Sequence, residues 1–262
     1  MVARLNVAVT GSSGFIGNAV CDSLKSYDYK VIPIANRLQV NDFLKDLEND
    51  KFDVVIHCAG KLYGSSDELY DSNVSLTKRI VSSIPNGSQV RLIFMSTGAV
   101  YGNTLGPSSS ELDENSPLDL YGQTKLEAEM EVLKYSRSTI LRLPSVYGEN
   151  NKKGLVFHIL DTIKNQRVFS LENGGIARRS FLNISDLVLV IAELIRVEIY
   201  GIFNVSEPED YSVKEIVSRF NLEFSNVSSS NSLSSMVLDS TKLSKYLDID
   251  YSNVLEFIEN AK

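Results

Sequence analysis

A glycine-rich stretch near the start of the chain, residues 10–17 (TGSSGFIG), most constrains the fold. A short β-prone run, residues 5–9, precedes it, and residues 15–26 carry apolar side chains at helical spacing. A strand, a glycine turn and a helix in this order bind phosphate, because the helix N-terminus presents unpaired N–H groups. We expect Gly11 to allow a tight turn, Gly14 to let the backbone approach a pyrophosphate, and Gly17 to let the helix pack closely on the strand. The spacing G-x-x-G-x-x-G is one residue longer than the common dinucleotide fingerprint, so alone it also fits a simple turn.

The composition narrows the class of protein. The 262 residues are 43% hydrophobic and 23% charged, which predicts one globular unit or a core domain with a smaller attached one. A net charge of −7 argues against a broad nucleic-acid or anionic-membrane surface, since both need clustered Lys and Arg. The most apolar later run, residues 187–195, is interrupted by Glu193 and too short to span a bilayer. We therefore expect a soluble, cytoplasmic protein with two reduced core cysteines, Cys21 and Cys58.

Alternating apolar runs and helical segments predict an α/β fold with a Rossmann-type, doubly wound parallel sheet. Strands are expected at residues 30–35, 53–58, 91–95 and 138–143, with helices at residues 67–83 and 120–134. Residues 38–40 fit a stunted third strand, and Asn41 fits the cap of the next helix.

The pattern changes past residue 148. We predict a dinucleotide-binding domain over residues 1–149 and a mainly substrate-binding C-terminal lobe over residues 150–262, with residues 181–206 returning to the sheet. The Ser-rich run 225–235 is expected to be a flexible connection, followed by two short helices.

The end of the second predicted strand is where a dinucleotide fold meets the adenosine ribose. An acidic residue there would favour NAD, but this chain has Ala35, Asn36 and Arg37, which suit the 2′-phosphate of NADP. The alternative is that Arg37 is a solvated loop residue. Ala59 and Gly60 end the next strand with small residues, where a cofactor could come close.

Tyr121 and Lys125 stand four residues apart on one predicted helix, so they share a face. The spacing alone is weak, but it follows a strand that ends in Ser96 and Thr97, which follows the glycine turn. A tyrosine that exchanges protons near neutral pH needs its pKa lowered from about 10 toward 7, roughly 4 kcal/mol. A lysine at about 4 Å supplies about that much at an effective dielectric near 20. We expect Lys125 to lower the pKa of Tyr121 and Thr97 to bond the same substrate oxygen.

Five motifs in order resemble the extended short-chain dehydrogenase/reductase family, and more narrowly its nucleotide-sugar epimerase and dehydratase branch. They are residues 10–17 (TGSSGFIG), 57–60 (HCAG), 96–102 (STGAVYG), 121–125 (YGQTK) and 141–148 (LRLPSVYG). The resemblance covers nearly the whole chain. It implies NAD or NADP as cofactor, a nucleotide-sugar substrate, and a homodimer that the helices at residues 67–83 and 120–134 could pair. Independently of the resemblance, no His, Cys or carboxylate spacing in the sequence suggests a metal site.

The resemblance also assigns roles to residues. Tyr121 is the acid/base, Lys125 binds the nicotinamide ribose and Thr97 lies beside the reacting hydroxyl. Contacts with substrate fall to Thr97, Ser145 and Arg179, the last on the diphosphate unless it is a surface arginine. Asp186 is expected to cap a helix rather than to touch ligand. Contacts with the cofactor fall to Gly11, Ser13, Gly14, Phe15, Ile16, Asn36, Arg37, Cys58, Ala59, Gly60, Asn73, Ser96, Tyr121, Lys125, Pro144 and Val146.

Departures from the pattern narrow the expected reaction. The 4,6-dehydratases of this branch have an acidic pair after the threonine, where this chain has Gly98 and Ala99, and the cysteine of the epimerase-reductases is missing. What remains is hydride transfer at one carbon, C4, by a 4-epimerase or a 4-keto-sugar reductase, and Arg37 favours the reductase. The alternatives are an NADPH-dependent reductase of a non-nucleotide ketone or aldehyde, and a non-catalytic NAD(P)-binding sensor. His57 and His158 fit no hydrolase or metal motif and are expected in packing or at the surface.

Overall fold

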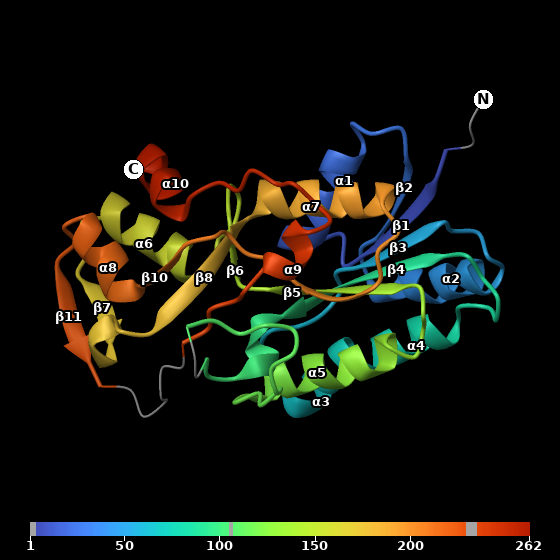
Figure 1. Cartoon of the computed structure of the whole chain (residues 1–262), viewed down its shortest axis with the longest axis horizontal. Helices are drawn as coiled ribbons and strands as arrows, with labels where there is room; N and C mark the ends of the chain where they lie inside the picture. The colour runs from blue at the N-terminus through green and yellow to red at the C-terminus, as the bar shows by residue number, and fades with distance from the viewer. Residues whose placement is uncertain (1–3, 105–106, 229–234) are drawn as a thin grey trace.

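A six-stranded parallel sheet forms the centre of the computed structural model, which describes residues 4–104, 107–228 and 235–262 (Figure 1). The strand order is β2-β1-β3-β4-β5-β9. All residues of β3 and β5 are buried, as expected for inner strands of a parallel sheet that is covered on both faces. The expected α/β fold is confirmed. The strands are β1 (Asn6–Thr10), β2 (Lys30–Ile34), β3 (Val54–His57), β4 (Arg91–Thr97), β5 (Ser138–Leu143) and β9 (Gly201–Asn204).

Helices cover both faces of this sheet (Figure 1). Helices α1 (Phe15–Leu24) and α7 (Ile184–Arg196) pack on one face, with short α9 (Thr241–Ser244) beside β9. Helices α2 (Arg37–Glu48), α4 (Leu76–Ser82) and α5 (Leu120–Val132) pack on the other face. Helix α3 (Ser66–Tyr70) continues through a π-helical segment, η1 (Asp71–Ser75), into α4, so the long helix expected over residues 67–83 is present with a wide turn inside it.

A smaller lobe at the left of Figure 1 has its own apolar core. It contains a three-stranded sheet in the order β10-β8-β6 and a parallel pair, β11 and β7. Its strands are β6 (Ser145–Tyr147), β7 (Phe169–Glu172), β8 (Arg178–Asn183), β10 (Asp210–Ser212) and β11 (Phe224–Val227). Its helices are α6 (Gly154–Lys164), α8 (Val213–Arg219) and α10 (Val254–Ala261), and it contains a 3₁₀ turn, η3 (Asn173–Gly175). Another 3₁₀ turn, η2 (Gly98–Tyr101), follows β4 of the central sheet.

Two expectations about elements are wrong, and the expected return of residues 181–206 to the sheet holds only for α7, which packs on the sheet, and β9, which joins it. Residues 38–40 are helical in α2 rather than a third strand, and the cap of this helix is Asn36 rather than Asn41, because the Asn36 side chain accepts from Leu38 N and Gln39 N. Residues 181–183 belong to β8 of the small sheet, so within residues 181–206 only β9 joins the central sheet.

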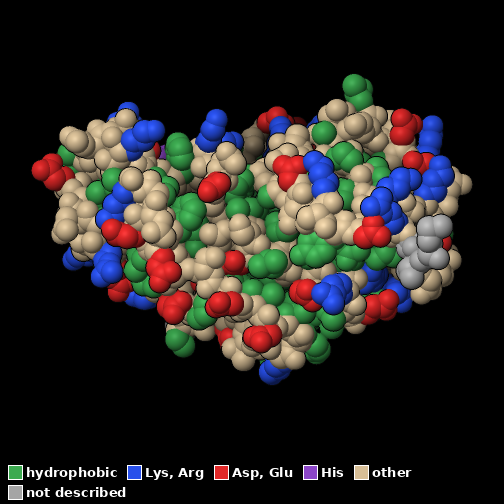
Figure 2. Space-filling view, turned by 90° about the horizontal axis from the view of Figure 1, so that it is seen from above, with side chains coloured by type: hydrophobic (Ala, Val, Ile, Leu, Met, Phe, Trp, Pro, Cys, Tyr) green, Lys and Arg blue, Asp and Glu red, His purple; other side chains and the backbone are tan. Residues whose placement is uncertain are grey.

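Other expectations about the C-terminal part had mixed outcomes. Residues 225–227 of the Ser-rich run form part of β11, whereas residues 229–234 lie outside the described part of the chain. The two short C-terminal helices are confirmed as α9 and α10. Among the described helices, none is long and apolar enough to cross a membrane. On the face shown in Figure 2, Lys and Arg side chains are interspersed with Asp and Glu.

Candidate active site

The glycine turn lies where the strand order reverses, between β1 and β3. Gly11 has φ +68°, and a Cβ there would lie 2.6 Å from Ala59 N at the end of β3. A Cβ on Gly17 would lie 2.3 Å from Gly11 O, so α1 packs against the turn only because Gly17 has no side chain. Helix α1 begins without a side-chain cap, and the buried Ser12 Oγ has no hydrogen-bond partner among the described residues. This cradle of open N–H groups and an unpaired hydroxyl fits a dinucleotide pyrophosphate.

The end of β2 is tied to this turn, because Ser13 Oγ donates to Ala35 O at 2.9 Å. The carboxamide oxygen of Asn36 is committed to capping α2, which leaves Arg37 as the charged group at this edge. Arg37 forms an ion pair with Asp71 at the start of η1. Arg37 therefore lies where an adenosine ribose would bind, but with a carboxylate beside it.

Asn73 organises the loop after β3. Its Oδ1 accepts from Lys61 N at 2.8 Å, and its Nδ2 donates to Lys61 O at 3.0 Å and to Thr124 Oγ1 at 2.9 Å. A Cβ on Gly60 would lie 3.0 Å from the same Oδ1. The side chain is buried, so Asn73 holds the loop that would face the cofactor.

His57 and Cys58 are packing residues at this edge. His57 is fully buried between two threonines, with Nδ1 2.7 Å from Thr10 Oγ1 and Nε2 2.9 Å from Thr77 Oγ1. Burial lowers its pKa to about 3, so the ring is neutral. Burial raises the pKa of Cys58 to about 12, which keeps its thiol protonated and unreactive.

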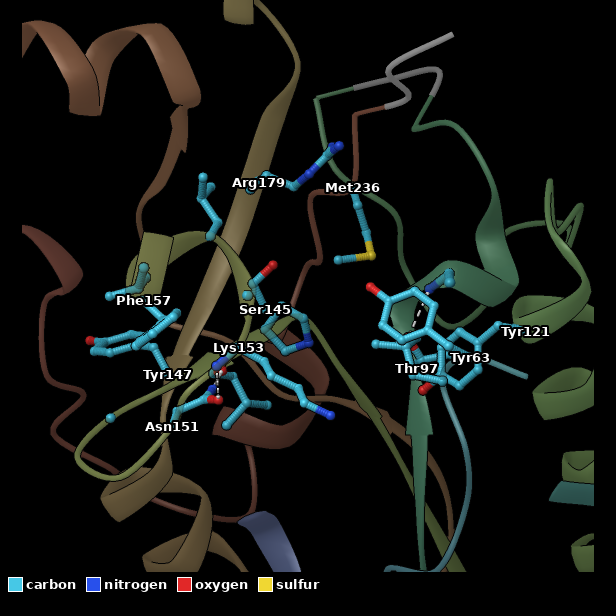
Figure 3. A pocket seen from close by; sticks show the side chains of 18 of the residues that line it. Tyr63, Thr97, Tyr121, Ser145, Tyr147, Asn151, Lys153, Phe157, Arg179 and Met236 are labelled. Carbon is cyan, nitrogen blue, oxygen red and sulfur yellow. Dashed lines mark hydrogen bonds between the residues drawn. The ribbon is translucent and has the colours of Figure 1, made fainter. Parts of the chain in front are cut away.

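Thr97 and Tyr121 face a cavity of about 600 Å³ at the carboxyl end of β4 (Figure 3). Thr97 ends β4, and Tyr121 lies in the first turn of α5, which Asp119 caps through Gly122 N at 2.7 Å. Burial raises the pKa of Tyr121 to about 12, although a hydrogen bond with Thr97 opposes the rise and Asp119 adds to it. The phenol is therefore protonated at neutral pH and ready to donate.

Lys125 lies one helical turn further along α5 and is buried. Its Nζ donates to Met95 O at 2.5 Å and lies 4.0 Å from the centre of the Phe94 ring. Burial lowers the pKa of Lys125 to about 8. The expectation that Lys125 lowers the pKa of Tyr121 is not met in this structure, because the ammonium is held by the main chain of β4 and burial dominates the phenol.

The small lobe supplies the opposite wall of the cavity, which is largely apolar but carries two cationic side chains, Lys153 and Arg179. Figure 3 shows the Lys153 amino group extending into the space from the start of α6, with Arg179 of β8 at the top. Its neighbour Arg178 is engaged elsewhere, in ion pairs with Asp210 and Glu215. Further lining residues on this side include Pro144, Ser145, Val146, Tyr147 and Asn151.

Residues 235–239, here called the strap, join the two walls. Met236 N donates to Arg178 O at 2.9 Å, and Ser180 N donates to Met236 O at 3.0 Å. On the other side, Ser109 N donates to Val237 O at 2.8 Å. The strap brings the Met236 thioether into the cavity between Arg179 and Tyr121 (Figure 3).

The strap also covers the position after Thr97. A Cβ on Gly98 would lie 3.1 Å from Met236 Sδ and 3.0 Å from Leu238 Cδ2. An acidic side chain at position 98 would therefore have to displace two apolar side chains. Met236 cannot be recognised as a site residue from the sequence, because nothing local links it to the threonine motif.

A buried ion pair lies behind the cavity. Glu129 accepts from Arg142 at 2.7 Å and from Ser96 Oγ, and the Arg142 guanidinium lies 4.6 Å from the Tyr101 ring centre. The side chain of Ser96 is thus committed to Glu129 and does not face the cavity. Sequence analysis missed this pair, although Glu129 stands four residues after Lys125 on the same helix face.

The expected role of Asp186 as a helix cap is wrong. Asn183 caps α7 through Ser185 N at 2.9 Å, and Asp186 instead accepts from Ser252 N at 2.8 Å and from Ser252 Oγ at 3.1 Å. In the described part of the chain, no cluster of His, Cys, Asp and Glu could hold a metal ion.

Comparison with known proteins identifies the family. The sequence model of the NAD dependent epimerase/dehydratase family matches residues 7–206. The chain belongs to this family. Its homologues and structural neighbours are extended short-chain dehydrogenase/reductase enzymes, as the five motifs indicate.

Three similar proteins illustrate the range of the family. The chain is 28% identical to the uncharacterised UDP-glucose epimerase YtcB of Bacillus subtilis (strain 168), over 82% of this chain and 80% of that protein. UDP-glucuronic acid 4-epimerase from Bacillus cereus, solved with UDP-glucuronic acid and NAD, has a TM-score of 0.86 at 21% identity, covering 97% of each chain. dTDP-4-dehydrorhamnose reductase from Bacillus anthracis, solved with NADP, has a TM-score of 0.81 at 19% identity, covering 99% of this chain and 98% of that one. The two solved structures share the fold of this chain.

Proposed function

We propose that the protein transfers hydride at one carbon, C4, of a nucleotide-diphosphate sugar, with NAD or NADP as cofactor. The observation that carries this proposal is the placement of the Tyr121 and Thr97 hydroxyls in one cavity that Arg179 and Lys153 border from the other lobe. The hydroxyls suit a sugar carbinol or ketone, and the two cations suit a diphosphate. The glycine turn beside Ala59 supports a dinucleotide at the adjoining edge of the sheet.

The chemistry follows from the protonation state of Tyr121. When bound, the nicotinamide supplies or accepts the hydride. In the reductive direction, Tyr121 donates its phenolic proton to the carbonyl oxygen of the sugar, and Thr97 donates a hydrogen bond to the same oxygen. Since the pKa of Tyr121 is about 12, the phenol is poised as an acid rather than as a base. Reduction of a 4-keto sugar and the second half of a 4-epimerisation both use this proton donation, so the protonated phenol serves either reaction.

The wall around the reacting carbon argues against elimination. Gly98 and Ala99 bring no acid or base, and Met236 and Leu238 occupy the space that a side chain on Gly98 would need. On the side of Gly98, a substituent of the substrate would therefore meet apolar groups rather than a carboxylate.

We also propose a homodimer, because apolar side chains remain exposed on the outer helices. Tyr70 of α3 and Met130 of α5 are half-exposed, and Leu133 follows directly after α5. The Tyr70 hydroxyl donates to Glu127 at 3.1 Å, so α3 and α5 form one continuous face. A Met130→Glu variant should be monomeric by light scattering if this face joins two subunits.

A second candidate is reduction of a free ketone or aldehyde by the same hydroxyls, because the cavity is apolar around Tyr63, Ala99 and Met236. Such a reaction would need no nucleotide. Stabilisation by UDP or dTDP in thermal unfolding, lost in Arg179→Met, supports the nucleotide sugar, whereas stabilisation by neither supports the free carbonyl substrate.

The deciding experiment follows NAD(P)H absorbance with 4-keto and 4-hydroxy nucleotide sugars. Tyr121→Phe should abolish turnover while keeping cofactor affinity, since it removes only the proton donor. Tyr135→Phe is the matched control, because its hydroxyl donates to Val90 O before the start of β4, away from the cavity. Near-full activity of Tyr121→Phe would refute the assignment. Absence of turnover in the wild type, with a dinucleotide bound, would favour the non-catalytic sensor.

A further inference from the structure

The position of Arg37 suggests how the chain could discriminate between the two dinucleotides. Arg37 is the first residue of α2 and follows β2, and Ser13 of the glycine turn is bonded to Ala35 in the same connection. In a dinucleotide fold this connection meets the 2′ position of the adenosine ribose. A guanidinium here is suited to a 2′-phosphate.

The guanidinium already has a carboxylate partner. Asp71, at the start of η1, forms an ion pair with Arg37 Nη2. The Arg37 and Asp71 side chains are 77% and 55% exposed, so the pair is weak and solvated, and a phosphate could replace the carboxylate. The two residues come from segments that lie on the same side of the sheet, with Asp71 only two positions before the loop-holding Asn73.

The pair affects the two cofactors differently. A 2′-phosphate brought to Arg37 gains an attractive contact and meets the negative charge of Asp71, so the two effects oppose each other. A neutral 2′-hydroxyl is not repelled by Asp71, and a carboxylate near this position is the usual mark of NAD binding. Arg37 alone would favour NADP, as the sequence predicts, and Asp71 works against that preference.

We propose that Asp71 determines cofactor specificity by restraining Arg37, so that the wild type binds NADH and NADPH with similar affinity. This inference rests on the proposed NAD(P)-dependent function. The preference between NADH and NADPH is then set by Asp71, a residue that lies outside both the glycine motif and the end of β2.

The test is fluorescence titration of the full chain with NADH and NADPH, which measures binding and requires no substrate. Asp71→Asn removes the charge while keeping the shape, and should tighten NADPH binding about fivefold with less than about a twofold change for NADH. Arg37→Ala should weaken NADPH about tenfold and NADH little. In the double variant, the gain for NADPH from Asp71→Asn should be smaller than in the wild type, because only the direct repulsion between Asp71 and the 2′-phosphate is left to remove.

Asp46→Asn is the matched control. It breaks another exposed carboxylate pair on α2, with Lys51, near the opposite end of the helix, and should leave both affinities unchanged. Thermal unfolding of each variant confirms that the fold is kept. An NADPH to NADH affinity ratio in Asp71→Asn within about twofold of the wild type would overturn this inference alone. Failure of the folded wild type to bind either dinucleotide would contradict the proposed function, and the inference with it.

Discussion

Asn73 holds both main-chain polar groups of Lys61, accepting from its N–H at 2.8 Å and donating to its C=O at 3.0 Å. The π-helical segment η1 places this carboxamide between the loop after β3 and Thr124 of α5. The wide helical turn of η1 therefore lets the Asn73 side chain connect the loop at the cofactor edge of the sheet to α5, the helix that carries Tyr121.

Replacing Asn73 by Ala should loosen this loop. The variant leaves the Lys61 groups unpaired, which should cost about 1–3 kcal/mol of unfolding free energy and weaken NADH binding about tenfold. Denaturant unfolding and fluorescence titration measure the two effects. Asn41→Ala, which removes a surface bond to Arg79, is the control and should leave NADH binding unchanged. Unaltered affinity in Asn73→Ala would show that the loop does not contact the cofactor.

The protonation state of Tyr121 predicts different pH dependences for the two reaction directions. Oxidation of a 4-hydroxy sugar needs the phenolate, so with a pKa of about 12 its rate should rise about tenfold per pH unit through neutral pH. Reduction of a 4-keto sugar uses the protonated phenol and should show no such rise. Initial rates in both directions across a pH series measure this. A plateau in the oxidation rate near pH 7 would indicate that the bound complex lowers the pKa of the phenol.

The Glu129–Arg142 pair predicts a large stability effect, because both side chains are almost fully buried. Glu129→Gln leaves a buried guanidinium without its counter-charge and should cost about 3–5 kcal/mol in denaturant unfolding. The double variant Glu129→Leu/Arg142→Met removes both charges and should be less destabilised than the single one. Glu193→Gln breaks the exposed pair with Arg196 and should cost less than about 1 kcal/mol. Equal losses in the two single variants would contradict this account.

His57 predicts a loss of stability in acid. Its pKa is lowered from 6.5 to about 3 on folding, so the unfolded chain binds the proton more readily and stability falls as the pH drops below about 6.5. The contribution amounts to about 2 kcal/mol between pH 7 and pH 5. The buried Glu207 has its pKa raised from 4.5 to about 7 by burial, which acts in the opposite direction over the same range.

The measurement must therefore compare two proteins. His57→Gln cannot take up the proton, so the difference in unfolding free energy between it and the wild type should change by about 2 kcal/mol from pH 7 to pH 5. A constant difference would mean that folding leaves the pKa of the His57 ring unchanged.

The sequence correctly predicted those features that depend on residues close to one another along the chain. Apolar runs predicted β3 and β4, because strands buried on both faces are mostly apolar. The β-prone run at residues 138–143 predicted β5, although it contains the buried, charged Arg142. The glycine spacing indicated the turn after β1, where close contacts leave no room for a Cβ. Residues 38–40 were misassigned because their local pattern is short and Asn36, not Asn41, provides the cap.

The sequence by itself thus determined the layered sheet, the phosphate-type turn and the helix face that carries Tyr121 and Lys125, since main-chain hydrogen bonding and apolar periodicity act over short stretches. Only the tertiary structure decided that Lys125 binds Met95 O, that Asp71 pairs with Arg37 and that Met236 covers Gly98. Charge, pKa and available space at a site depend on groups that packing brings from distant parts of the chain, and no local pattern records those partners.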